Sequence, residues 1–253
     1  MGNKAEHEEH ISTQDRNTQH NSIKNYDVVV IGSGFGGAIT ACRLAQAGRS
    51  VCIIEKGRRW RRFDFPRGSG EVSKSAIADE RNRQSPNGFI EYRTFKNIDI
   101  IQGTGVGGGS LHYFNVHKQA PAFIFDLPAW PTSINLKQLT PYYNLAADML
   151  AATTICNTND RDIPIRTQVF EDAVNSIGLK AERVPICVHL NNLNNKQVDS
   201  KPSCDHCGNC LLGCHLHAKN TLDLNYIALA EAHGADVLPQ HEALNITPHP
   251  QRY

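Results

Sequence analysis

The stretch from Tyr26 to Glu55, YDVVVIGSGFGGAITACRLAQAGRSVCIIE, decides the fold of this chain. It opens with the β-branched run from Val28 to Ile31, which predicts a parallel strand buried on both faces. Three glycines follow with the spacing G-x-G-x-x-G, and apolar residues at helical spacing come after them. A second apolar run, residues 51–54, ends at Glu55. The stretch therefore predicts a β-α-β unit of the Rossmann type.

The glycine loop of this unit predicts a dinucleotide site. Its glycines let backbone N–H groups approach a pyrophosphate, and the helix start attracts negative charge. Glu55 follows the glycines by about 20 residues, where an acid can accept hydrogen bonds from both ribose hydroxyls. A turn that merely joins a strand to a helix is the alternative, but strand, helix and acid all agree with a nucleotide site. Because an acid here disfavours a 2′-phosphate, FAD or NAD is favoured over NADP.

Composition limits the class of protein. With 26 basic and 25 acidic side chains among 253 residues, the charge is nearly balanced and does not indicate a nucleic-acid partner. No apolar run reaches the roughly eighteen residues of a membrane span. The first residues lack the apolar stretch of a signal peptide, so we expect a cytoplasmic protein without a transmembrane segment. Residues 1–24 are polar and predict a disordered arm, followed by one domain over 25–253.

A second glycine cluster follows a predicted strand at residues 98–102. It reads GTGVGGGSL from Gly103 to Leu111, and it allows a close approach to a flat or phosphorylated ligand. A flexible linker is the alternative, but apolar Val106 and Leu111 disfavour it. A nicotinamide enzyme does not need this loop, which makes an NAD-dependent reductase the weaker enzyme hypothesis.

At this point the chain resembles the glucose-methanol-choline (GMC) flavoprotein oxidoreductases, in their cholesterol-oxidase-like bacterial branch. The resemblance rests on these blocks, in the order of the family: IGSGFGGAITACRLAQAG, IIEKGRRW, GTGVGGGSLHYFNV, AWP followed by LTPYY, and CGNCLLGCHLHAKNTLDLNYIALAEAHGADV. It implies an α/β fold with a Rossmann-like FAD-binding domain, in which a parallel sheet has flanking helices. It also implies oxidation of a CH–OH group in a small-molecule alcohol such as a sterol, with hydride transfer from the alcohol carbon to flavin N5.

The resemblance implies cofactor contacts in three segments. The first glycine loop would hold the FAD pyrophosphate and Glu55 the adenosine ribose, the second glycine loop would line the flavin, and the segment after the strand at 235–238 would lie near the adenine. Tyr113 stands where many relatives place an Asn near the flavin, which is a departure from the family pattern. The expected cofactor-binding residues are Gly32, Ser33, Gly34, Phe35, Gly36, Gly37, Glu55, Gly103, Gly107, Gly109, Ser110, Asn115, Val116 and Ala243.

A cysteine-rich insert at about residues 200–218 predicts a metal site. Its spacing C-x2-C-x2-C-x3-C, from Cys204, Cys207, Cys210 and Cys214, is typical of iron–sulfur ligation in bacterial ferredoxins. There the fourth cysteine serves a second cluster. A single run therefore needs either a chain that folds back at its last cysteine or a remote ligand such as Cys187 or Cys156.

Three other interpretations of the insert stay open. Nearby histidines, at positions 206, 215 and 217, make a tetrahedral zinc site an alternative. The four thiols can also be reduced structural cysteines, or they can form disulfides, which the reducing cytoplasm disfavours.

Function follows from these parts in three classes. The first is the FAD-binding portion of an alcohol oxidoreductase; the others are a non-catalytic flavin-binding remnant and an electron-transfer module built on the cysteines. The family's catalytic pair, usually His with Asn or a second His, is expected after Tyr253, so we expect an incomplete domain, no catalytic residue in this chain and a complementary carboxy-terminal half as partner. Alone, the chain should turn over little or no alcohol.

Overall fold

The computed structural model describes residues 24–67, 71, 77–79, 88–155, 163–190 and 202–248. The expected arm at residues 1–24 lies outside them, apart from Lys24.

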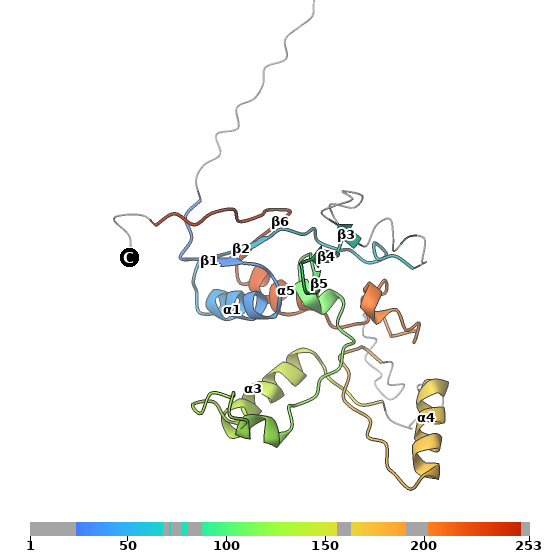
Figure 1. The fold of residues 1–253 in the computed structure, drawn as a ribbon. Coiled ribbons are helices and arrows are strands. Elements are labelled where there is room, and N and C mark those ends of the chain that lie inside the picture. The colour runs from blue at the N-terminus through green and yellow to red at the C-terminus, as the bar shows by residue number, and fades with distance from the viewer. Residues whose placement is uncertain are drawn as a thin grey trace, which may run out of the picture.

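A three-stranded parallel sheet forms the nucleotide-binding unit. Its order is β1 (Val28–Ile31), β2 (Val51–Glu55) and β6 (Asp236–Pro239), with Val28 opposite Val51 and Cys52 opposite Asp236. Helix α1 (Phe35–Gln46) connects β1 to β2, and α5 (Tyr226–Ala232) precedes β6. Both helices lie on the same side of the sheet (Figure 1). This arrangement confirms the expected α/β fold with a parallel sheet and flanking helices.

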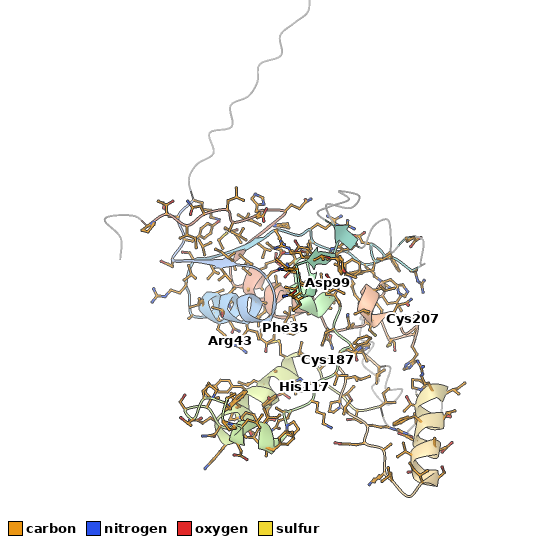
Figure 2. All side chains as sticks on the ribbon, viewed as in Figure 1. Phe35, Arg43, Asp99, His117, Cys187 and Cys207 are labelled. Atoms are coloured by element: carbon orange, nitrogen blue, oxygen red, sulfur yellow. The ribbon has the colours of Figure 1, made fainter. Side chains whose placement is uncertain are left out.

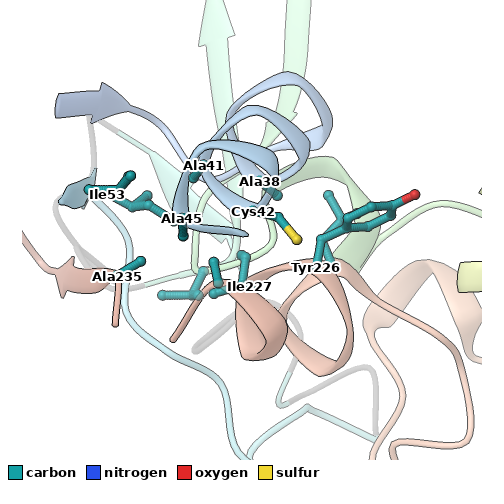
Figure 3. Packing of buried hydrophobic residues seen from close by; sticks show 12 residues of the cluster. Ala38, Ala41, Cys42, Ala45, Ile53, Tyr226, Ile227 and Ala235 are labelled. Carbon is teal, nitrogen blue, oxygen red and sulfur yellow. The ribbon is translucent and has the colours of Figure 1, made fainter. Parts of the chain in front are cut away.

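The hydrophobic core lies between this sheet and its helices. Small residues on one face of α1, among them Ala38, Ala41 and Ala45, are fully or almost fully buried against Ile53 of β2 and Ile227 of α5 (Figure 3). Their small side chains let α1 approach α5 and the sheet closely. Each square ångström of apolar surface removed from water here contributes about 25 cal/mol.

The expectation that β1 is buried on both faces is wrong for the described residues. Val29 and Ile31 are 50% and 55% exposed, whereas the alternate residues Val28 and Val30 are partly buried. The reason is that β1 is an edge strand of this sheet and that α1 and α5 cover the same face.

A second sheet carries the second glycine loop. Strand β4 (Ile90–Thr94) pairs in parallel with β3 (Ile77–Asp79) and antiparallel with β5 (Asp99–Gly103), the strand expected at 98–102. After β5 the chain forms the short 3-10 helix η2 (Gly108–Leu111). Leu111 packs into a buried aromatic cluster with Trp60, Phe65 and Phe89, which fixes the loop against the β4–β5 hairpin.

The remaining elements lie between η2 and α5 in sequence. They are η3 (Ala122–Asp126), α3 (Leu136–Met149), α4 (Ile165–Ser176), η4 (Cys210–Leu212) and η5 (Leu222–Leu224). Helices α3 and α4 lie away from the two sheets (Figure 1), and neither contains a fully buried residue. Within the described part of the chain, no helix has the length and apolar character needed to cross a membrane.

Candidate cofactor site

A cavity of about 990 Å³ opens beyond the carboxyl ends of β1 and β2. This is the place where doubly wound α/β sheets bind their ligands. Its walls come from the first glycine loop, the ends of β2 and β5, the second glycine loop, the cysteine loop and the segment after β6. Residues from these walls are Gly32, Gly34, Glu55, Lys56, Gly103, Gly109, His112, Tyr113, Leu211, Leu212, His241 and Ala243.

The first glycine loop has the geometry of an anion site. A Cβ at Gly37 would lie 2.0 Å from the carbonyl oxygen of Gly32, so only glycine lets α1 start this close to β1. A Cβ at Gly34 would meet nothing within 4 Å, and Gly34 lines the cavity. Gly34 is also the N-cap of α1, where no side chain caps the helix and no acid stands in the first turn. The helix start therefore presents free N–H groups and partial positive charge to a phosphate.

Glu55 is held by the protein itself. Its Oε2 accepts hydrogen bonds from the Ser33 backbone N–H (3.0 Å) and hydroxyl (2.6 Å), and its Oε1 accepts from the N–H groups of Gly57 (2.9 Å) and Gly105 (3.3 Å). Glu55 is only 6% exposed, although it lines the cavity. Glu55 thus ties the first glycine loop to the second.

Ser33 completes this connection. Its side chain is fully buried, and its hydroxyl accepts a hydrogen bond from the N–H of Gly107 at 3.0 Å. Because both its N–H and its hydroxyl are bonded within the protein, Ser33 orients the two loops.

The second glycine loop touches the first. A Cβ at Gly108 would lie 2.6 Å from the Cα of Gly34, so the two loops meet backbone to backbone. Ser110 closes the turn: its hydroxyl donates to the carbonyl of Gly107 (2.7 Å) and accepts from the N–H of Leu222 (3.0 Å). The cavity is therefore framed by two loops that are locked together.

His112 is a site residue that the sequence reasoning missed. Its ring stacks on Phe89, with centroids 5.2 Å apart and planes at 12°, and fits where Gly103 has no side chain. Both ring nitrogens are buried, and neither has a hydrogen-bond partner within the described residues. Burial, helped by the charge of Lys219, lowers the pKa of His112 to about 4. At neutral pH this cavity wall therefore holds a neutral imidazole.

The structure separates the expected cofactor residues into two groups. Lining the cavity are Gly32, Ser33, Gly34, Glu55, Gly103, Gly109 and Ala243. The others, Phe35, Gly36, Gly37, Gly107, Ser110, Asn115 and Val116, are not among its lining residues. The motif spacing predicted the loops, but which of their residues face the cavity depends on how the loops dock. The position of His112, directly after GGGSL, was the signal available in the sequence.

Asn115 belongs to a different place. It is buried and donates from Nδ2 to the Cys210 sulfur at 3.2 Å. It lines a second cavity of about 390 Å³, which the four cysteines of the insert line as well. Cys207 in this loop lies on the side of the molecule away from α1 (Figure 2).

For the zinc site that the histidines of the cysteine loop suggested, the described residues offer no ready set of ligands. Among the described residues, no three His, Cys, Asp or Glu side chains lie close enough to share one ion. His215 Nε2 lies 3.9 Å from Asp205 Oδ2, and the His217 ring packs against Phe65. The four thiols are free, which does not match the disulfide alternative, and burial raises the pKa of Cys204 to about 11.

Comparison with known proteins agrees with this geometry. A family model described as an FAD binding domain matches residues 27–66. A cholesterol oxidase of Acinetobacter baumannii is 31% identical over 88% of this chain and 42% of its own length. A long-chain-alcohol oxidase of Arabidopsis thaliana is 25% identical over 93% of the chain and 30% of its own length. A gluconate 2-dehydrogenase flavoprotein of Pantoea cypripedii is 22% identical over 83% of the chain and 43% of its own length.

The chain thus spans less than half of the length of each of these relatives. It contains an FAD-binding domain, and FAD is the cofactor that this domain and its flavoprotein relatives support. The resemblance to the FAD-binding part of the GMC oxidoreductases, in the cholesterol-oxidase-like branch, is confirmed.

Proposed function

We propose that this FAD-binding domain of the GMC oxidoreductases serves a flavin-dependent oxidation of alcohol CH–OH groups, with sterols or other long apolar alcohols as the substrate class. The observation that carries the proposal is the cavity of about 990 Å³ framed by two interlocked glycine loops. The names of the relatives, cholesterol oxidase and long-chain-alcohol oxidase, support this substrate class. Residence in the cytoplasm and a complementary carboxy-terminal half remain predictions.

The residues of the cavity fit FAD in two respects. The open N-terminus of α1 at Gly34 suits the pyrophosphate, because a side chain there would fill the space that the phosphate needs. The ring of His112 lines the cavity and is held flat against Phe89, which suits contact with a flat heterocycle. When bound, FAD supplies the hydride acceptor for alcohol oxidation.

The chain's own residues bind and orient the cofactor. Glu55 and Ser33 hold the two loops in register, and the stacked ring of Phe89 keeps His112 at the cavity wall. The described residues assign no base for the alcohol proton. Its contribution is therefore cofactor binding and positioning.

Cofactor binding is tested by reconstitution. The full chain is incubated with excess FAD and desalted, and bound FAD is read from the flavin absorbance. We expect yellow protein. Gly34→Val should weaken FAD binding by about tenfold or more, equivalent to about 1.4 kcal/mol, with an unchanged circular dichroism spectrum. Thr40→Val, on the exposed face of the same helix, is the matched control and should bind as the wild type does.

Catalysis is tested by adding a carboxy-terminal half from a relative. Bleaching of the bound flavin on addition of a sterol or a long-chain alcohol would support the proposed oxidation. Colourless desalted protein would refute the cofactor role. Bound FAD that no alcohol bleaches in the presence of the added half would instead favour a flavin-binding remnant.

A further inference from the structure

We propose that Cys204, Cys207, Cys210 and Cys214 hold one iron–sulfur cluster in a cavity beside the cofactor cavity. The four residues line a single cavity of about 390 Å³. Cys214 therefore folds back to join the other three, at a turn where Gly213 has φ +86°. With all four cysteines at one cavity, the run does not need a remote fourth ligand. Cys187 is not among the residues that line this cavity, and Cys156 lies outside the described residues.

Hydrogen bonds to the sulfurs form the second observation. The backbone N–H of His206 donates to Cys204 Sγ (3.4 Å), and that of Lys219 donates to Cys214 Sγ (3.4 Å). Asn115 Nδ2 donates to Cys210 Sγ at 3.2 Å. A neutral thiol is a weak acceptor, so donors at three of the four sulfurs are the pattern expected where the sulfurs carry negative charge. Such hydrogen bonds are also one of the means by which proteins tune iron–sulfur clusters.

A buried positive charge is the third observation. Lys219 is 1% exposed, and its ammonium donates to the carbonyls of Cys210 (2.7 Å), Leu111 (2.9 Å) and Tyr113 (3.2 Å). Within the described ranges, no carboxylate lies at ion-pair distance from it. A buried charge without a counter-charge is costly. The thiolates of a cluster at Cys210 and Cys214 would supply the missing negative charge.

A cluster and a single ion require different spacings of their ligands. Zinc requires its sulfur ligands about 2.3 Å from one point. No three candidate side chains in the described part of the chain come together in that way. A cluster distributes its four cysteines over separate iron atoms, so the sulfurs surround a wider space. A cavity lined by all four residues agrees with the second arrangement.

One loop contributes to both cavities. Leu211 and Leu212, between the third and fourth cysteines, line the cofactor cavity, and Cys210 and Gly213 on either side of them line the second cavity. Lys219 connects the same loop to the carbonyls that follow the second glycine loop.

If the proposed function holds, the cluster would accept electrons one at a time from the reduced flavin. Two transfers would restore FAD, release two protons and reduce two equivalents of an external one-electron acceptor, such as a ferric complex. This role, which rests on the proposed function, is that of a dehydrogenase.

The site is tested on the full chain purified without air, with iron, acid-labile sulfide, zinc and FAD measured in the same sample. We expect iron and sulfide in equal amounts, roughly four of each per chain for a [4Fe–4S] cluster. We also expect a paramagnetic resonance spectrum that changes on reduction with dithionite. Zinc without sulfide, or protein without any metal, would overturn the proposal.

Two variants locate the cluster. Cys207→Ser is informative because Cys207 is exposed, so the loss of its sulfur leaves the core intact; this variant should lose most of the iron. Cys52→Ala removes a thiol of β2 outside the loop and should keep all of it. Equal iron in Cys207→Ser and wild type would overturn the assignment. The FAD measurement separates the two proposals. Iron and sulfide without FAD would refute only the proposed function. FAD without iron would refute only the cluster.

Discussion

The Ser33 hydroxyl donates a 2.6 Å hydrogen bond to Glu55 Oε2 and accepts one from the N–H of Gly107. Three segments that are far apart in sequence, the first glycine loop, the end of β2 and the second glycine loop, therefore meet at one buried pair. The place of Glu55 in the sequence, after the glycine loop and the second strand, predicted a contact with the ribose of FAD. In the structure the carboxylate also supports the architecture of the site, and this second role can be measured without cofactor.

Glu55→Gln should destabilise the FAD-free protein. The amide that replaces one carboxylate oxygen cannot accept the hydrogen bonds made there, so at least one buried donor loses its partner, at a cost of about 1–3 kcal/mol. Urea unfolding of the FAD-free variant and wild type measures the difference. Gln46→Ala, on the exposed end of α1, serves as a control with little effect. Equal stability of Glu55→Gln and wild type would mean that the carboxylate acts only on the cofactor.

Gly37→Ala and Gly34→Ala should fail in different ways. A methyl group at position 37 would lie 2.0 Å from the Gly32 carbonyl, so α1 must move from β1 and the fold loses stability, by about 1–3 kcal/mol or more. A methyl group at position 34 meets no atom within 4 Å, so that variant should keep its stability and lose affinity for FAD. Thermal unfolding and FAD titration of both variants check the contrast. Similar loss of stability in both would contradict the geometry of the loop.

His112 should make the protein less stable in acid. Its pKa is about 4 in the folded chain, below the ordinary value of 6.5, so between these values the unfolded chain takes up a proton that the folded chain excludes. Stability therefore falls as the pH drops from about 6.5 to 4. At 1.36 kcal/mol per pKa unit, and allowing for partial exposure, the contribution is roughly 2–3 kcal/mol. Denaturant unfolding at several pH values should show a shallower decline in His112→Leu than in wild type. The exposed His233, as His233→Gln, should not alter the decline.

The cysteine loop packs on the aromatic cluster through Gly213 and Phe65. Substitutions at these two positions should therefore have coupled effects on the free energy of unfolding. A Cβ at Gly213 would lie 2.0 Å from Phe65 Cδ1, and the positive φ adds strain to any other residue. Gly213→Ala should therefore destabilise strongly, and Phe65→Ala by about 3–5 kcal/mol. Because the second change removes the ring that the new methyl group would strike, the double variant should lose less than the sum. Additive losses in this double-mutant cycle would show that the two sites are independent.

Much of the nucleotide-binding unit was predictable because its determinants are local. A β-branched run, glycines at fixed spacing and apolar residues at helical spacing each act over a few residues, and β1, α1 and β2 formed where these patterns indicated. The burial of β1 was not predictable in the same way. It depends on which layers cover the sheet, and Val29 shows that one face of this edge strand stays exposed.

The sequence by itself determined the parallel α/β unit, the two glycine loops and the cysteine spacing, because backbone sterics and side-chain periodicity act between near neighbours. Only the tertiary structure decided which residues face the cofactor cavity, how Glu55 joins the two loops, and that Cys214 returns to the cavity of the other cysteines. It also brought His112 against Phe89 and Lys219 against the cysteine loop. The physical reason is that these arrangements depend on how segments up to about two hundred residues apart dock on one another. Pairing of buried polar groups, rather than any local pattern, selects among the possible ways of docking.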